Sequence, residues 1–414
     1  MNVDTLEVAA STHVLHELIV DLDVYNPAAP GGDFHAAWVR IQKTAERPLV
    51  WSPRYGGHWI ALGGEDILNI YSDHERFSSV ANTVPPSTSR KLLGALHMDP
   101  PQHATFRAFL NDGLSPKVVR GLEPGVRTLA IELIDSFKPR GGCEFIGEFA
   151  NVLPLTVFLN LVDLPLADRN MLAGWASAAT HETGVQKRDA ASRAIRDYLV
   201  PVILERRRGL GEDMLSRIVH AKVDGRSLTN DEAVAGCTHL LIAGLDTVSS
   251  MLGFVMRFLA RNPDHRLLLI REPERIPSAV KELIRRFPLV VMAREVRADT
   301  DFQGVTLKGG DMIVIPTILF NLDERQYPDS LAVEWDRPVP RHMQLRRRRT
   351  PLPWGSARPA RGGDRPGGMA DPHPRVPRGR KPADHGERRH CRNNRSPASA
   401  LVKAALHSCN SASA

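Results

Sequence analysis

The composition of the chain changes abruptly after Met343, and this change limits how much of the chain can fold. Residues 344–414 contain no Ile, Phe or Tyr and a single Trp, and they are rich in Arg, Pro, Gly, Ala and His. Such a segment cannot bury enough apolar surface to offset the entropy lost on ordering. We therefore expect one folded domain within residues 1–343 and a disordered, basic tail over residues 344–414.

The net charge of +7 is unevenly distributed along the chain. The tail holds 16 of the 54 Lys and Arg residues but only 4 of the 47 Asp and Glu residues. The first 343 residues are therefore mildly acidic and the tail is strongly basic. Because basic tails are typical of proteins that bind nucleic acid or a membrane surface, non-specific nucleic-acid binding by the tail is one hypothesis.

The length of 414 residues and the hydrophobic content of 42% suit a soluble globular enzyme. No apolar run approaches the roughly 20 residues that span a bilayer, and the N-terminus lacks the basic start of a signal peptide. Cys143, Cys237, Cys391 and Cys409 show no CxxC spacing and predict neither a zinc site nor a disulfide framework. We expect a cytoplasmic protein with no membrane attachment.

Helical spacing of apolar residues dominates the first 343 positions. It predicts helices over FHAAWVRIQKTA (34–45) and over residues 117–137, 190–206, 231–260 and 276–287. Thr229 to Glu232 read T-N-D-E, a capping box that starts the longest of these helices. Two hairpins are predicted, one from PLVWSP and HWIALGG and one from VTLKGGDMIVIPT around Gly309 and Gly310. The fold class is therefore mainly α with small β hairpins or a small sheet.

The longest apolar helix carries polar residues in HLLIAGLDTVSSMLGF (239–254). Thr247 can bond back to a carbonyl one turn earlier, and Gly244 removes a side chain that would crowd it, so the helix can bend or open near Asp246. The alternative is an ordinary buried helix in which the Thr247 hydroxyl forms a hydrogen bond within its own helix.

Two other pairs of residues share helix faces. Glu282 and Arg285 in KELIRRF stand three apart, as in common surface ion pairs. His103 and Arg107 in MDPPQHATFRAFLND stand one turn apart after a Pro-Pro helix start, where they could grip an anion together. Each pair taken alone is more simply explained by a solvated helix face.

Taken together and in this order, H-x-x-x-R, A-G-x-D-T and E-x-x-R resemble the cytochrome P-450 family of heme-thiolate monooxygenases. Seven further stretches are similar to its bacterial camphor-hydroxylating branch in residue identity and spacing. They are AWVRIQ, GGHWIALGG, HERFSS, HMDPP, NPDHRLLLIREPERIP, LIRRFPLV and NLDERQYPDS. The resemblance covers nearly everything from Asp21 to Met343. It implies the cytochrome P-450 fold, truncated at the loop that supplies the heme ligand.

The resemblance implies heme b as the cofactor and assigns residues to it. His103, Arg107, Arg294 and His342 match positions that pair with the heme propionates, as guanidinium and imidazole groups can. The family also requires F-x-x-G-x-x-x-C-x-G, whose Cys thiolate is the axial iron ligand. That motif is absent, and the Cys position falls at Leu352.

The same resemblance implies catalytic and structural residues. Asp246 and Thr247 match the pair that delivers protons to iron-bound dioxygen, and Gly244 matches the point where the helix loosens to admit oxygen. A buried triad that braces the heme-proximal side is matched by Glu282, Arg285 and Arg337.

The codons after Met343 can encode the missing ligand loop if they are read one base later. In that frame, the codons of Gln344 to Trp354 permit NFGAGAHRCLG, which contains the required motif. Residues 367–378 permit E-E-W-L-x-R-x-P-E-F-R, with the Trp forced by the Met369 codon, and this is similar to the family's last helix and strand. We infer a one-base frameshift near the Met343 codon, in the gene or in its reading, so the basic tail has no evolved partner.

We therefore expect a monomeric monooxygenase that hydroxylates a small apolar, terpenoid-like substrate with O2. The resemblance implies that electrons come from NAD(P)H through a ferredoxin reductase and a [2Fe–2S] ferredoxin. The chain as written should be inactive because it lacks the Cys ligand. A non-catalytic relic that keeps an apolar cavity is the alternative, and nucleic-acid binding by the tail is less favoured because the tail has no recognition motif.

Substrate-contacting residues are harder to predict. Lys91 stands where the camphor branch has a substrate-binding Tyr. Leu240, Val248, Leu289 and Val290 are candidate pocket walls, although core packing explains these four apolar residues equally well.

Overall fold

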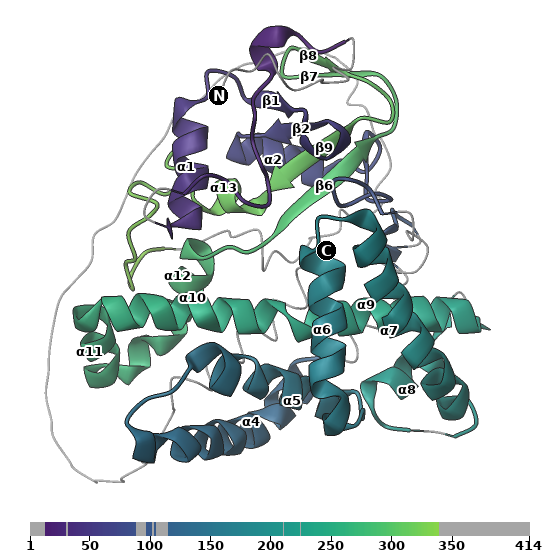
Figure 1. Cartoon of the computed structure of the whole chain (residues 1–414), viewed down its shortest axis with the longest axis vertical. Coiled ribbons are helices and arrows are strands. Elements are labelled where there is room, and N and C mark those ends of the chain that lie inside the picture. The colour runs from purple at the N-terminus through teal and green to yellow at the C-terminus, as the bar shows by residue number, and fades with distance from the viewer. Residues whose placement is uncertain are drawn as a thin grey trace, which may run out of the picture. The chain divides into compact units, whose positions relative to one another are not determined.

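The computed structural model describes residues 13–29, 32–87, 97–101, 103–104, 115–209, 211–223 and 225–338. Within these ranges the fold is mainly helical with small sheets, as predicted (Figure 1). The predicted domain boundary at Met343 and the predicted tail lie outside the described residues.

The described helices include the five predicted segments, with the segment over residues 231–260 divided at Asp246, and several that the sequence did not predict. They are α1 (Phe34–Thr44), α2 (Gly64–Ser72), α4 (Pro116–Phe137), α5 (Val152–Leu161), α6 (Arg169–His181), α7 (Val185–Arg206), α8 (Met214–Val219), α9 (Asn230–Leu245), α10 (Thr247–Arg261), α11 (Pro263–Arg271), α12 (Ile276–Arg286) and α13 (Thr317–Asn321), with a π-helical turn at Ile146–Ala150.

The strands form one mixed sheet and two short hairpins. They are β1 (Leu49–Ser52), β2 (His58–Ala61), β3 (Phe77–Ser78), β4 (Lys222–Val223), β5 (Arg226–Ser227), β6 (Val291–Val296), β7 (Thr300–Phe302), β8 (Val305–Leu307) and β9 (Met312–Pro316). The five-stranded sheet has the order β1-β2-β9-β6-β3, in which β9 runs parallel to β2 and antiparallel to β6.

The first predicted hairpin is confirmed. β1 and β2 pair antiparallel, with Val50 opposite Ile60 and Trp51 opposite Trp59. Residues of both strands are buried in the core that the sheet shares with α1, α2 and α13.

The second predicted hairpin, around Gly309 and Gly310, is wrong. β8 pairs with β7, which precedes it, and β9 enters the main sheet between β2 and β6. Gln303 (φ 55°) and Gly304 (φ 76°) form the tight turn between β7 and β8, and consecutive positive φ values suit the twist of a two-residue hairpin. The continuous apolar run of β9 is buried along its whole length, which favours a central strand over a hairpin arm.

The predicted capping box at the start of α9 is confirmed. Thr229 Oγ1 accepts a hydrogen bond from the Glu232 backbone N–H at 3.2 Å, and a Glu232 carboxylate oxygen accepts one from the Thr229 N–H at 2.8 Å. These reciprocal bonds fix the first turn of the helix.

Helices α9 and α10 run end to end through the described part of the chain, with the sheet on one side and α4 and α5 on the other (Figure 1). Together they span Asn230–Arg261, the one helical stretch among the described residues that is long and apolar enough to cross a membrane. This corrects the statement from the sequence that no apolar run approaches that length. However, 56% of the most apolar window is buried inside the protein, as in a core helix.

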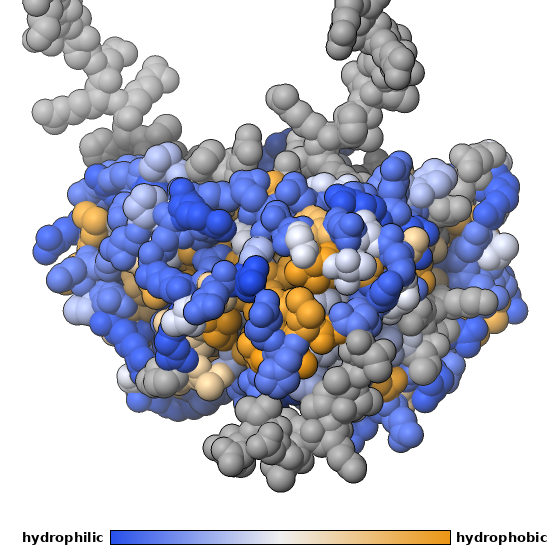
Figure 2. All heavy atoms as spheres, turned by 90° about the horizontal axis from the view of Figure 1, so that it is seen from above, coloured by the Kyte–Doolittle hydropathy of each residue, from blue (hydrophilic) through white to orange (hydrophobic). Residues whose placement is uncertain are grey.

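Hydrophilic side chains cover most of the described face that Figure 2 shows, and hydrophobic ones gather near its centre. The buried apolar residues of α9 pack with those of α5 to α8 in one cluster, and α10 packs with α11 and α12 in another. The α9–α10 junction therefore lies between these two helix clusters, with the main sheet on one side of it (Figure 1).

Candidate active site

The long helix is interrupted at Asp246. Its backbone (φ −125°, ψ −41°) lies between the last residue of α9 and the first residue of α10. The Thr247 hydroxyl donates to the Ala243 carbonyl oxygen at 3.2 Å. A threonine that bonds to the preceding turn in this way helps to bend a helix, so the break arises where the sequence places Gly244, Asp246 and Thr247.

Gly244 lies against the ring of Phe158 on α5. A Cβ at this position would come closer than 3.0 Å to three ring carbons of Phe158, whose side chain is itself buried. Glycine is therefore required here for the close approach of α5 to α9.

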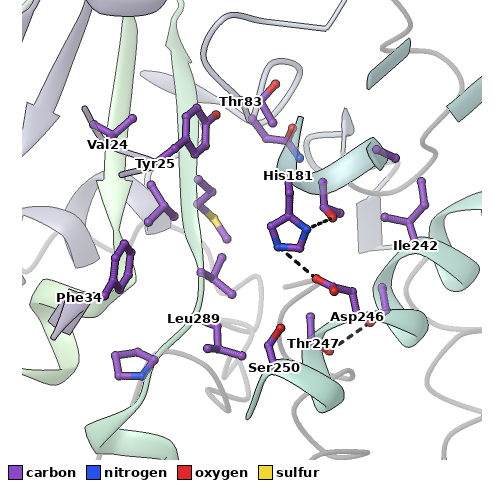
Figure 3. A pocket seen from close by; sticks show the side chains of 18 of the residues that line it. Val24, Tyr25, Phe34, Thr83, His181, Ile242, Asp246, Thr247, Ser250 and Leu289 are labelled. Atoms are coloured by element: carbon purple, nitrogen blue, oxygen red, sulfur yellow. Dashed lines mark hydrogen bonds and ion pairs between the residues drawn. The ribbon is translucent and has the colours of Figure 1, made fainter. Parts of the chain in front are cut away.

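A cavity of about 530 Å³ lies beside the break. Figure 3 shows Asp246, Thr247 and Ile242 on one side of it and Tyr25 and Phe34 on the other. The walls are formed by Val24, Tyr25, Phe34, Asn82, Thr83, Ala179, Thr180, His181, His239, Ile242, Ala243, Asp246, Thr247, Ser250, Phe254, Pro288, Leu289, Val290, Val291 and Met292.

The Asp246 carboxyl group contacts a histidine at this cavity. Its Oδ2 lies 3.3 Å from Nε2 of His181, the last residue of α6 (Figure 3). Burial raises the pKa of Asp246, and the nearby His181 opposes that rise. The cavity therefore holds a carboxyl group that keeps its proton more readily than an exposed aspartate.

Of the four apolar residues predicted to line the cavity, two do so and two do not. Leu289 and Val290 line the cavity, as expected. Leu240 and Val248 are not among its lining residues, because they are buried in helix clusters, Leu240 with α5 to α8 and Val248 with Ala150 and Leu252. For these two residues core packing is the correct explanation, and Lys91 lies outside the described residues.

Glu282, Arg285 and Arg337 form one buried network. Arg285 Nε and Nη2 donate to the two carboxylate oxygens of Glu282 at 2.7 and 2.8 Å, and Arg337 Nε donates to Glu282 Oε1 at 3.2 Å. The side chains of Glu282 and Arg285 are 0% exposed and that of Arg337 is 7% exposed. Arg285 also donates to the backbone carbonyls of Asn321, Ser330 and Ala332.

The residues expected to hold propionates are only partly described. Arg294 is buried on β6, where Nη1 donates to the Ala293 carbonyl oxygen at 2.8 Å and the guanidinium lies over the Tyr71 ring. Arg294 stands two residues after Met292, which lines the cavity. Because side chains alternate along a strand, the side chains of these two residues point to the same side of β6. The His103 backbone N–H donates to the Asp99 carbonyl oxygen, whereas Arg107 and His342 lie outside the described residues.

Sequence reasoning missed Tyr25 and His181. Tyr25 lies in an irregular segment near the N-terminus and His181 at the end of α6, and neither stands in a motif. Only the packing of α6 on α9 and the path of the chain before α1 bring them to the cavity.

Comparison with known proteins identifies the family. A cytochrome P-450 profile matches residues 182–356. The probable cytochrome P-450 127A1 of Sinorhizobium fredii (strain NBRC 101917 / NGR234) is 33% identical over 319 residues, which are 76% of this chain and 77% of that protein. The chain belongs to the cytochrome P-450 family.

Other relatives agree with this assignment. The mycinamicin IV hydroxylase/epoxidase of Micromonospora griseorubida is 29% identical over 70% of this chain and 76% of that protein. The crystal structure of CYP101J2 is 40% identical with a TM-score of 0.74, covering 80% of this chain and 84% of that chain. The fold is thus the cytochrome P-450 fold, and by family the protein is a monooxygenase with heme as its cofactor.

The described residues offer part of what a heme group requires. The buried Arg294 guanidinium can pair with a carboxylate such as a propionate, and the cavity beside the helix break has mostly apolar walls. No cysteine among the described residues lines the cavity, since Cys143 is exposed and Cys237 is buried in α9 among apolar side chains. Burial also raises the pKa of the Cys237 thiol, which disfavours the thiolate that would bind iron.

Proposed function

We propose that the folded part of this chain is the body of a heme-dependent monooxygenase that hydroxylates a small apolar, terpenoid-like molecule with O2. The observation that supports this proposal is the cavity of about 530 Å³, in which apolar walls surround an acid and an alcohol at a helix break. Its volume falls within the roughly 300–1,000 Å³ usual for small-molecule sites.

Heme supplies the oxygen chemistry when it is bound. The residues of the chain orient the substrate, exclude water and hold protons. Asp246 suits the last of these roles, because burial raises the pKa of its carboxyl group and so favours its protonated form. Thr247 lies beside it, and its hydroxyl is oriented by the Ala243 carbonyl oxygen.

Tyr25 is a candidate for binding an oxygen atom of the substrate. Its hydroxyl accepts a hydrogen bond from the Val84 N–H at 3.2 Å and another from the Arg188 side chain, so its oxygen is held in place at the cavity wall. Burial raises the pKa of Tyr25, so the hydroxyl stays a neutral donor. Together with Asn82 and Thr83 on the same cavity wall, it favours a hydrocarbon-rich ketone or alcohol as substrate.

Electrons are proposed to come from NAD(P)H through a ferredoxin reductase and a [2Fe–2S] ferredoxin, as in the bacterial branch that the sequence resembles. The similarity to CYP101J2 supports this partner class. We further propose that the protein acts as a monomer in the cytoplasm.

The thiolate ligand is proposed to come from the shifted reading frame after Met343, and the chain as written is proposed to be inactive. The support is the sequence NFGAGAHRCLG that the codons of residues 344–354 permit, together with the lack of a suitable cysteine among the residues around the cavity. A non-catalytic relic with an apolar cavity is the second candidate, and the same lack of a cysteine favours it.

The test compares the chain as written with a variant whose residues after Met343 follow the shifted frame of the gene. Both proteins are reduced in the presence of heme and CO, and their difference spectra are recorded. A thiolate-type Soret band is expected only from the shifted-frame variant. Such a band from the chain as written would refute its proposed inactivity, and its absence from both proteins would favour the relic. Sequencing the gene around the Met343 codon tests the frameshift itself.

A further inference from the structure

Arg188 is a buried cation next to the cavity. It lies in the first turn of α7 and is 4% exposed. Its Nη2 donates to the Pro85 carbonyl oxygen at 2.5 Å, and its side chain also donates to the Tyr25 hydroxyl. Both of these acceptors are uncharged. The Arg188 Nε is buried and has no hydrogen-bond partner within the described part of the chain.

Two features make this an unfavourable place for a positive charge. A buried charge is generally stabilised by an opposite charge, but the neighbouring carboxylate of Asp189 accepts a hydrogen bond from Ser87 Oγ at 2.6 Å. In addition, the dipole of a helix disfavours a cation in its first turn. The position of Arg188 is therefore better explained by its effect on Tyr25 than by its contribution to stability.

Tyr25 connects Arg188 to the cavity. The Tyr25 side chain lines the cavity, whereas Arg188 is not among the lining residues (Figure 3). The Tyr25 oxygen accepts one hydrogen bond from the Val84 N–H at 3.2 Å and another from Arg188. A phenol oxygen that accepts two hydrogen bonds acts towards a further group as a donor. Hydrogen bonds in a chain also strengthen one another, so the guanidinium makes Tyr25 a stronger donor.

We propose that Arg188 is a positioning residue that acts through Tyr25 and makes the cavity select a substrate with a hydrogen-bond-accepting oxygen, such as that of a ketone. This inference rests on the proposed role of Tyr25 in binding an oxygen atom of the substrate. It adds the residue that fixes the phenol as a donor. Arg188 itself does not touch the substrate in this arrangement.

The experiment measures calorimetric binding of a bicyclic ketone and of the matching hydrocarbon by the full chain. The ketone preference is the Kd of the hydrocarbon divided by the Kd of the ketone. It is determined for the wild type, Arg188→Met, Arg188→Lys, Tyr25→Phe and the double variant of Tyr25→Phe with Arg188→Met. Lys187→Met is the matched control, because its side chain is 76% exposed and pairs with Glu182.

Arg188→Met should reduce the ketone preference about 3-fold, because the phenol loses the charged donor that fixes its oxygen. The affinity for the hydrocarbon should not change, since a hydrocarbon forms no hydrogen bond with Tyr25. Arg188→Lys keeps a charged donor and should retain most of the preference, and Lys187→Met should retain all of it. Replacement of a buried ion by an apolar side chain of similar volume is often neutral for stability, so Arg188→Met should fold, which circular dichroism checks.

The double variant separates an effect through Tyr25 from a general effect on the fold. In the Tyr25→Phe background, Arg188→Met should cause no further loss of ketone preference, because residues that act as one unit are not additive. A further loss of about 3-fold in that background would overturn the inference, since Arg188 would then act without Tyr25.

A ketone preference that is the same in the wild type and in Arg188→Met would also overturn the inference. The readout requires neither heme nor turnover, so it is independent of the spectral test. Loss of the preference in Arg188→Met without a Soret band in either protein of that test would support the role of Arg188 and refute the proposed monooxygenase. A Soret band together with an unchanged preference would do the reverse.

Discussion

Glu282→Gln removes one charge from the buried network of α12 while keeping the shape of the side chain. Two guanidinium groups, those of Arg285 and Arg337, then stay buried without their carboxylate. Removing one partner of a buried ion pair generally costs about 3–5 kcal/mol. Arg285 keeps three backbone carbonyl acceptors, so we expect the lower end, about 3 kcal/mol. Urea unfolding followed by circular dichroism measures this loss.

Glu334→Gln is the matched control for this prediction. The Glu334 carboxylate also pairs with Arg337, at 2.8 Å, but its side chain is 56% exposed. Exposed pairs contribute roughly 0–1 kcal/mol, so this variant should unfold almost like the wild type. The argument from burial would be refuted if the two variants lost similar amounts of unfolding free energy.

Three further substitutions test the cavity and the core. Gly244→Ala should lower the unfolding free energy by about 1 kcal/mol. The new Cβ clashes with the Phe158 ring, at a cost of about 1–3 kcal/mol, and this outweighs the gain of about 1 kcal/mol in helix propensity. A variant that is more stable than the wild type in urea titrations would contradict this prediction. Tyr25→Phe should weaken calorimetric binding of a bicyclic ketone about 5-fold, the loss of one neutral hydrogen bond, and leave the matching hydrocarbon unaffected. Burial lowers the pKa of His35 to about 4 from an ordinary value of 6.5, so the unfolded chain binds the extra proton and the unfolding free energy falls between pH 6.5 and 4. In His35→Gln the urea midpoint should depend less steeply on pH across that range, and an unchanged slope would exclude His35 as the cause.

Local signals in the sequence predicted much of the fold. The T-N-D-E capping box set the start of α9, and the Gly244, Asp246 and Thr247 pattern indicated the helix break. In each case the interacting atoms lie within one or two turns of each other along the chain, so sequence spacing alone brings them together. Glu282 and Arg285 are also neighbours on one turn of α12, but the solvated helix face that their spacing alone suggested is wrong, since both side chains are 0% exposed, and only the family resemblance implied a buried triad.

Contacts between distant segments could not be predicted in this way. The pairing of β9 with β2 and β6 depends on strands that stand far away in the sequence, so the local Gly-Gly turn wrongly suggested a hairpin with β8. His181 reaches Asp246 only because α6 packs on α9. Leu240 and Leu289 are equally apolar, and only the three-dimensional structure separates the core residue from the cavity wall.

The last described segment is held to the rest of the fold by contacts with residues that precede Met343. Arg337 donates to the Pro328 carbonyl oxygen at 2.9 Å as well as to Glu282, and Trp335 is buried with Phe287 and Val333 against α10 and α12. These contacts fix the chain only a few residues before the change of composition at Met343, and they use no residue beyond it. The frameshift proposed above begins after this segment and would leave these contacts unchanged, so a urea midpoint that is the same for the chain as written and for the shifted-frame variant is the expected result.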